Sequence, residues 1–259
     1  MKTVAVVQAR MNSTRLPGKV LKKLVGKPMV WHIINRLGFA KSIDETILAI
    51  PAGDQPLEDF AREYGFNYYA GSEDDLLDRC YQAARQCRAD AAVRITADCP
   101  LVDPEVIDRL MRFFTEEGPF DFAGNSRPKA SWPHGLDAEV YDMEAMGKVW
   151  REEKDPFKRE WLNTNFLLHP DKYKIGNLVN EEDLSSYRWT VDYEEDFIFM
   201  TEVFQRLYRE GEVFLMQETV RLLQQHPELT GINSKYARDE AFKQALEEEG
   251  IDAKSIFPG

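Results

Sequence analysis

Short apolar runs alternate with segments of helical periodicity through the first half of the chain, and this alternation constrains the fold most strongly. The apolar runs, which predict strands, lie at residues 3–8, 46–50, 67–69 and 91–95. The segments between and after them have apolar residues at helical spacing, over residues 28–40, 55–64, 73–87 and 103–116. Such βαβα order predicts an α/β fold with a mostly parallel sheet covered by helices on both faces.

Two of these helices carry start signals. Ser72 precedes the segment 73–87, whose first turn is acidic, and is therefore the expected N-cap. Asp103 and Pro104 occupy the N-cap and first helical positions of the next helix.

The second half has a less regular rhythm. We expect strands at residues 120–123, 138–141, 172–178 and 188–191, and helices at 143–153, 156–166, 194–209, 217–226 and 237–249. The absence of a linker or repeat indicates one α/β domain over residues 1–215, including an interrupting segment near 125–166. Residues 216–259 are expected to form a C-terminal helical extension.

The loop after the first strand concentrates groups that bind anions. It contains the cations Arg10, Arg15 and Lys19 and the hydroxyls of Ser13 and Thr14. Arginine forks, a lysine and backbone amides suit a triphosphate, and ligands of open α/β sheets bind beyond the carboxyl ends of strands. The spacing fits neither a P-loop nor a dinucleotide fingerprint. A solvated basic loop is the alternative.

Charge and composition exclude several other classes. The net charge of −12 and the pI near 4.9 argue against a nucleic-acid partner. No apolar run approaches the length of a membrane span, so no membrane partner is expected. Three cysteines without CxxC spacing, and the absence of a signal-peptide pattern, favour a cytoplasmic protein.

Several sequence blocks resemble the cytidylyltransferases that make CMP-activated sugars. These are Gln-Ala-Arg at 8–10, Ser-Thr-Arg-Leu-Pro-Gly-Lys at 13–19, and the blocks at 71–79, 94–104, 135–140 and 189–196. The resemblance covers about residues 1–200. It is greatest to the SpsF branch, which takes part in spore coat polysaccharide biosynthesis. The sugar-acid and acylneuraminate cytidylyltransferases are more distant.

The resemblance implies a fold, a reaction and a set of nucleotide-binding residues. The fold is a Rossmann-like, GT-A-like nucleotidyltransferase sandwich of three layers. The reaction transfers CMP from CTP to a sugar-type acceptor for surface polysaccharide or glycoprotein synthesis, and releases pyrophosphate. The residues implied to hold the triphosphate and to act in catalysis are Lys19, Arg10 and Arg15; those implied to bind the rest of the nucleotide are Gln8, Ala9, Ser13, Thr14, Gly18 and Arg79.

Magnesium is the cofactor that this reaction implies, and two aspartates match the family's metal ligands. Asp98 follows the strand at 91–95, and Asp192 precedes the helix at 194–209. Each has a structural alternative, because Asp98 can cap a turn and Asp192 can cap a helix. Arg79 has one too, as the i,i+4 partner of Asp75 on a helix face.

The acceptor is expected to bind the irregular second half. Its candidate residues are Asn125, His134, Asp137, Glu139, Arg159 and Trp161. Trp161 stands where relatives often carry histidine. Its ring can cover a sugar, or it can simply fill the core.

A homodimer is also implied, with residues 125–135 and 143–166 as candidate contacts. Trp132, Trp150 and Trp161 crowd this region and can serve an interface or the core of one subunit.

Two other functions fit parts of the pattern. A glycosyltransferase of similar fold would commonly carry an Asp-x-Asp motif after a strand, and Asp98-Cys99-Pro100 lacks it. A non-catalytic nucleotide-sugar-binding subunit would be favoured by missing phosphate or metal residues, but Lys19, Asp98 and Asp192 are all present.

Overall fold

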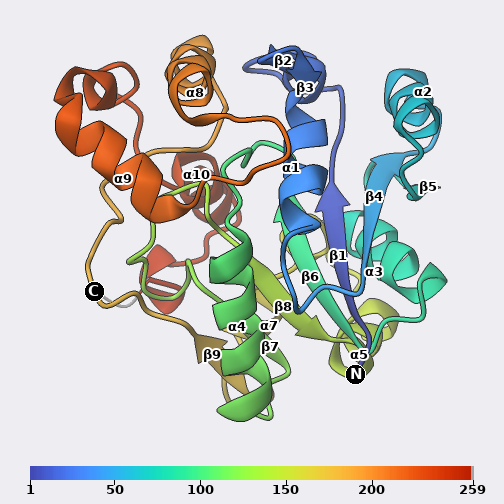
Figure 1. The fold of residues 1–259 in the computed structure, drawn as a ribbon. Helices are drawn as coiled ribbons and strands as arrows, with labels where there is room; N and C mark the ends of the chain where they lie inside the picture. The colour runs from blue at the N-terminus through green and yellow to red at the C-terminus, as the bar shows by residue number, and fades with distance from the viewer. Residues whose placement is uncertain (258–259) are drawn as a thin grey trace.

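A seven-stranded sheet forms the centre of the computed structural model, which describes residues 1–257 (Figure 1). The strand order is β5-β4-β1-β6-β8-β7-β9, and the strands from β5 to β6 are parallel. β8 is antiparallel to both β6 and β7, whereas β9 is parallel to β7. The strands are β1 (Thr3–Gln8), β4 (Glu45–Pro51), β5 (Tyr68–Gly71), β6 (Ala91–Thr96), β7 (Phe122–Gly124), β8 (Glu139–Asp142) and β9 (Ile175–Asn177), with a separate hairpin of β2 (Lys23–Leu24) and β3 (Lys27–Pro28).

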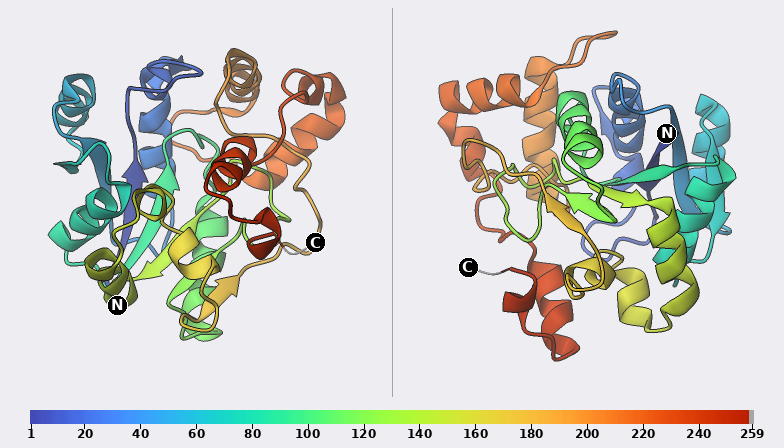
Figure 2. Two further views of the ribbon diagram at one scale, coloured as in Figure 1. Left: turned by 180° about the vertical axis from the view of Figure 1, so that it is seen from behind. Right: turned by 90° about the horizontal axis from the view of Figure 1, so that it is seen from below.

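Helices cover both faces of the sheet, as Figure 2 shows from two further sides. Side chains of α1, α2 and α4 pack with one face, and those of α3, α5 and α7 with the other. A third core lies around α8 and α9. The helices are α1 (Met29–Leu37), α2 (Gln55–Tyr64), α3 (Leu76–Gln86), α4 (Pro104–Glu116), α5 (Met143–Glu152), α6 (Pro156–Glu160), α7 (Thr164–Leu167), α8 (Glu194–Leu207), α9 (Met216–Gln225) and α10 (Glu240–Glu248), with short 3₁₀ helices at Lys19–Leu21, Pro227–Gly231 and Ala253–Ser255.

The buried centre of the sheet explains why β1 reads as a continuous apolar run. Val4, Val6 and Val7 are at most 1% exposed, because helices cover the strand on both sides. The predicted α/β sandwich with a mostly parallel sheet is therefore confirmed. Asp103 also caps α4 as predicted, accepting hydrogen bonds from the amides of Glu105 and Val106.

The predicted start of α3 at Ser72 is wrong. The helix begins at Leu76, and the carboxylate of Asp75 caps it by accepting from the amide of Asp78 (2.9 Å). The buried guanidinium of Arg79 donates to the carbonyls of Ser72 and Glu73, which holds these residues outside the helix.

Three predictions in the second half also need correction. The helix expected over 156–166 breaks at Trp161 into α6 and α7. The strand expected over 172–178 shrinks to β9. The strand expected over 188–191 is a single bridge between Arg188 and His134. Only glycine at position 135 allows this close approach, because a Cβ there would lie 2.5 Å from the backbone of Trp189.

The C-terminal region packs at two separate places. α9 lies against α8, whereas α10 contributes Phe242 and Leu246 to the core on the α3 side of the sheet. The last two residues of the extension predicted over 216–259 lie outside the described part of the chain. Within residues 1–257, each helix is too short or too polar to cross a bilayer.

Candidate active site

Two adjoining cavities lie beyond the carboxyl ends of β1 and β6. The first, of about 290 Å³, is lined by the opening loop and is called here the loop cavity. The second, of about 190 Å³, is lined in part by residues 237–242 and is called the tail cavity. Asp98, Asp192 and Trp161 line both, so the two cavities share a wall.

The ammonium of Lys19 connects the loop to both predicted metal ligands. It donates to Oδ2 of Asp98 (2.9 Å), to Oδ1 of Asp192 (2.8 Å) and to the carbonyl oxygen of Val191 (2.8 Å). Lys19 is only 8% exposed, so it is not a solvated surface lysine. The structure brings together three residues that the sequence placed in three separate motifs.

Lys19, Asp98 and Asp192 stabilise one another's charged forms. Burial acts to lower the pKa of Lys19, but the charges of Asp98 and Asp192 outweigh it, and the pKa is raised. Burial likewise acts to raise the pKa of Asp98, yet Lys19 and the hydroxyl of Thr96 hold it well below its usual range. For Asp192, burial and the charge of Asp98 oppose ionisation, while Lys19 and Arg15 favour it, and the pKa is lowered.

Two arginines add to the positive charge around Asp192. A terminal nitrogen of Arg15 lies 2.7 Å from Oδ1 of Asp192, and Arg188 lies 3.5 Å from Oδ2. Arg188 is itself held by Asp196, which is fully buried. The carboxylates at the junction therefore face three cations.

Asp98 does not cap a turn, and Asp192 does not cap a helix. The side chain of Asp196, not that of Asp192, caps α8, because it accepts hydrogen bonds from the amides of Asp192 and Tyr193. The carboxylate of Asp98 accepts from side chains instead of capping a turn. Both carboxylates consequently point into the cavities.

The opening loop supplies most of its predicted residues to the loop cavity. They are Gln8, Ala9, Arg10, Ser13, Thr14, Arg15 and Lys19. Gly18 lies outside this lining, and its φ of 68° turns the chain into the 3₁₀ helix that carries Lys19. Arg10 is exposed and lies 3.7 Å from Glu160, so its guanidinium can reach a ligand without breaking a tight ion pair.

Arg79 does not line either cavity. It is 1% exposed, burial lowers its pKa, and it holds the turn before α3. It is not the partner of Asp75, whose carboxylate accepts from Nε of Arg159 (2.7 Å).

The residues predicted to bind the acceptor fall into two groups. His134, Asp137, Glu139 and Trp161 line the tail cavity. Asn125 and Arg159 line neither cavity. The side-chain amide of Asn125 donates to the carbonyl oxygen of Leu136 and accepts from the amide of Ala138. Arg159 donates to the carboxylate of Asp75 and to the carbonyl oxygens of Trp150 and Glu153.

Sequence reasoning missed several cavity residues. Arg94 and Thr96 lie on β6, and a charged residue inside a buried strand was the available signal for Arg94. Arg188 precedes a block that carries the family resemblance. Asp239 and Phe242, which also line the tail cavity, gave no signal, because nothing in their local sequence connects them to residues a hundred positions earlier.

A family model covers most of the chain. Residues 4–225 match the family model described as cytidylyltransferase. The chain belongs to the cytidylyltransferase family. It is therefore an enzyme of the nucleotidyltransferase type.

Three curated relatives differ in how far their function is known. An uncharacterised protein of Methanocaldococcus jannaschii, MJ1063, is 30% identical over 95% of this chain and all of its own length. The spore coat polysaccharide biosynthesis protein SpsF of Bacillus subtilis is 27% identical over 86% of this chain and 94% of its own. The 3-deoxy-manno-octulosonate cytidylyltransferase of Geobacter sulfurreducens is 27% identical over 77% of this chain and 80% of its own.

Solved structures show the same fold. A cytidylyltransferase from Leptospira borgpetersenii has a TM-score of 0.83 and 27% identity, covering 89% of this chain and 97% of its own. A CMP:2-keto-3-deoxy-manno-octonic acid synthetase solved with CTP has a TM-score of 0.63 and 18% identity, covering 80% and 100%.

The carboxylates of this cytidylyltransferase fit a magnesium ion that takes its other ligands from phosphate and water. No group of three or more histidine, cysteine or acidic side chains within the described residues forms a complete metal cage. Asp98 and Asp192 nevertheless converge on one ammonium, and two carboxylates are the protein share that Mg²⁺ usually takes, with phosphate oxygens and water as its other ligands.

Proposed function

We propose that this cytidylyltransferase uses CTP and Mg²⁺ to transfer CMP to a hydroxyl of a sugar-type acceptor, releasing pyrophosphate. The observation that carries the proposal is the meeting of Lys19, Asp98 and Asp192 at the wall shared by two cavities. The loop cavity suits the nucleotide, since Arg10, Arg15 and Lys19 bring three cations to it from the opening loop. The tail cavity is then the place for the acceptor.

The chemistry asked of the protein is mainly positioning and charge stabilisation. The acceptor oxygen attacks the α-phosphorus, the bond from that phosphorus to the bridging oxygen of the β-phosphate breaks, and pyrophosphate leaves. The hydroxyl proton is lost to solvent. Arg10, Arg15 and Lys19 would bind the phosphates and offset the negative charge that grows on the leaving group.

Asp98 and Asp192 would hold the magnesium ion. When bound, the ion supplies positive charge that polarises phosphate oxygens. The ammonium of Lys19 now occupies the space between the two carboxylates, and it can turn toward phosphate oxygens when these arrive with their own cation.

The nucleotide and the pathway are inferred partly from relatives. One solved neighbour is described as complexed with CTP, and a relative is named for spore coat polysaccharide biosynthesis. Gln8 ends β1 and Ala9 follows it, and both line the loop cavity, where backbone and amide groups can read a base edge. Surface polysaccharide or glycoprotein synthesis is the proposed setting.

The test is pyrophosphate release from CTP, ATP, GTP or UTP with Mg²⁺ and a panel of sugars. The panel comprises 3-deoxy-manno-octulosonate, N-acetylneuraminate, glucosamine and N-acetylglucosamine. We expect release with CTP that depends on one acceptor and on Mg²⁺. Faster release with another nucleotide would overturn the CTP assignment, and acceptor-independent CTP binding without turnover would favour a non-catalytic subunit.

A further inference from the structure

Residues 237–242, called here the tail segment, form one wall of the tail cavity. Ala237, Asp239, Glu240, Ala241 and Phe242 all line it. Ala241 also lines the loop cavity, so the tail segment reaches the junction where Asp98 and Asp192 lie. The family match ends at residue 225, and this wall therefore lies outside the matched part of the chain.

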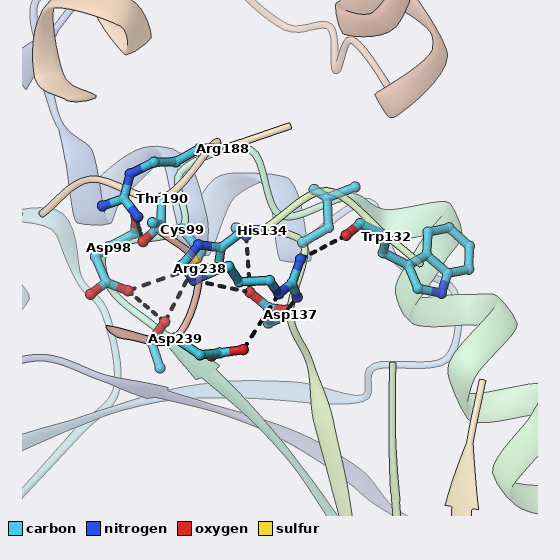
Figure 3. Close-up of polar contacts among 12 residues, drawn as sticks. Asp98, Cys99, Trp132, His134, Asp137, Arg188, Thr190, Arg238 and Asp239 are labelled. Carbon is cyan, nitrogen blue, oxygen red and sulfur yellow. Dashed lines mark hydrogen bonds and ion pairs between the residues drawn. The ribbon is translucent and has the colours of Figure 1, made fainter. Parts of the chain in front are cut away.

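Ion pairs fasten the tail segment to residues of the second half. Arg238 donates to Asp137 (2.5 Å) and to the carbonyl oxygen of Trp132 (2.9 Å), as Figure 3 shows. Asp239 accepts from Arg127 (2.5 Å), and its side chain is only 9% exposed. These contacts hold the segment in one position beside the cavity.

Aromatic contacts add an apolar side to the same wall. The ring of Phe242 lies 4.7 Å from that of Trp161, and the guanidinium of Arg127 lies 4.3 Å from Phe242. Trp161 lines both cavities. The partly exposed Trp161 thus offers a face for a sugar ring, with Phe242 packed against it in the same lining.

The charges of the wall indicate which groups of a ligand it would bind. The four guanidiniums that line the tail cavity (Arg15, Arg94, Arg127 and Arg188) are each paired with a carboxylate of this chain. The side chain of Glu240, in contrast, makes no hydrogen bond or ion pair within residues 1–257. An exposed carboxylate at the rim accepts hydrogen bonds, so hydroxyl or amine groups complement it.

We propose that the tail segment is part of the acceptor site and selects a polyhydroxylated sugar. Glu240 and Asp239 accept hydrogen bonds from the hydroxyl or amine groups of the sugar, and Trp161 covers its ring. This inference rests on the proposed function, because it assigns the tail cavity to the acceptor. It adds a specificity-determining segment that residues 1–225 do not contain.

The test measures KM for the acceptor and for CTP separately in Glu240→Gln and Asp239→Asn. The acceptor is the panel sugar that supports pyrophosphate release by the wild type. Loss of a hydrogen bond to a charged group should raise the acceptor KM about ten-fold or more, with the KM for CTP changed less than about two-fold. Glu247→Gln, an exposed acid on the same helix, is the matched control and should leave both unchanged.

The outcomes separate this inference from the proposed function. Equal changes in both KM values, or no change in acceptor KM in either variant, would overturn the role of the tail segment while leaving the transferase activity intact. If the wild type releases no pyrophosphate with CTP and any panel sugar, the proposed function itself fails. Glu240 is exposed, so Glu240→Gln is expected to fold even where loss of the Asp239–Arg127 pair destabilises the other variant.

Discussion

At the scale of single residues, one location accounts for both the observed contacts of Lys19 and its proposed role. It is buried between Asp98 and Asp192, where its charge keeps two neighbouring carboxylates ionised. It also lines the cavity that suits a triphosphate. The same ammonium therefore counters the negative charge of the two carboxylates and is proposed to bind the phosphates of the nucleotide.

Lys19→Ala should lower turnover by about 10²–10³-fold, the usual loss for one electrostatic donor to a transition state. The two carboxylates would then repel each other, so Mg²⁺ should raise the Tm of the variant more than that of the wild type. Lys23→Ala, at an exposed lysine nearby, is the control. Near-normal turnover of Lys19→Ala in the pyrophosphate assay would contradict the prediction.

Asp98→Asn and Asp192→Asn should each weaken activation by Mg²⁺, because a neutral amide is a poorer ligand for a hard dication. Titrating Mg²⁺ in the same assay measures the change. Asp74→Asn, on an exposed turn, should behave as wild type. If only Asp98→Asn responds, Asp192 acts through Lys19 and Arg15 and is not a metal ligand.

His32 should make stability depend on pH. Burial lowers its pKa from 6.5 to about 4 in the folded protein, so the unfolded chain binds more protons between these values. The stabilisation is complete above about pH 6.5 and is lost as the pH falls toward 4, by on the order of 3 kcal/mol. Urea unfolding of His32→Gln should show a smaller loss between pH 7 and 4.5, whereas His169→Gln, at an exposed position, should follow the wild type.

At the scale of elements, Asp103 links the start of α4 to the start of α9. One oxygen accepts from the amides of Glu105 (2.8 Å) and Val106 (3.2 Å), and the other accepts from the amide of Met216 (2.5 Å). The side chain is 2% exposed. The cap thus ties α9 to the sheet domain, although sequence signals identified only its role in α4.

Asp103→Ala should therefore cost more than the loss of an ordinary cap. We expect the free energy of unfolding to fall by about 2–3 kcal/mol, because three amides lose their acceptor in a buried place. Asp142→Ala, which removes a half-buried cap of α5, should cost about 1 kcal/mol. Equal losses in urea denaturation would mean that the bond to Met216 contributes nothing.

At the scale of the whole molecule, the homodimer remains a prediction. Of the three tryptophans considered for an interface, Trp132 is fully buried, Trp150 stacks on Tyr81, and Trp161 lines the cavities. Burial within one subunit therefore excludes Trp132 from an interface, whereas Trp150 and Trp161 are partly exposed. Light scattering at micromolar concentration should give a mass near twice 30.0 kDa, and a monomer mass would refute the dimer.

The sequence by itself determined the parts of this protein that depend on neighbours along the chain. Continuous apolar runs predicted the strands of the first half, because both faces of a central parallel strand are buried. Helical spacing of apolar residues predicted the helices, because one helix face recurs every 3.6 residues. The opening loop displayed its cations directly. Local signals failed where another side chain bound the backbone, as when Arg79 held Ser72 and Glu73 outside the helix that Ser72 was expected to cap.

Only the tertiary structure decided which of these groups meet. Lys19 lies 79 residues from Asp98 and 173 from Asp192. It meets Asp98 because β1 and β6 are adjacent in the sheet, and it meets Asp192 because the amide of Val191 donates to the carbonyl oxygen of Asp98 (2.8 Å). The tail segment closes the second cavity from still further along the chain. Spacing along the sequence does not predict such contacts, because they arise from strand order and from the face on which each helix packs.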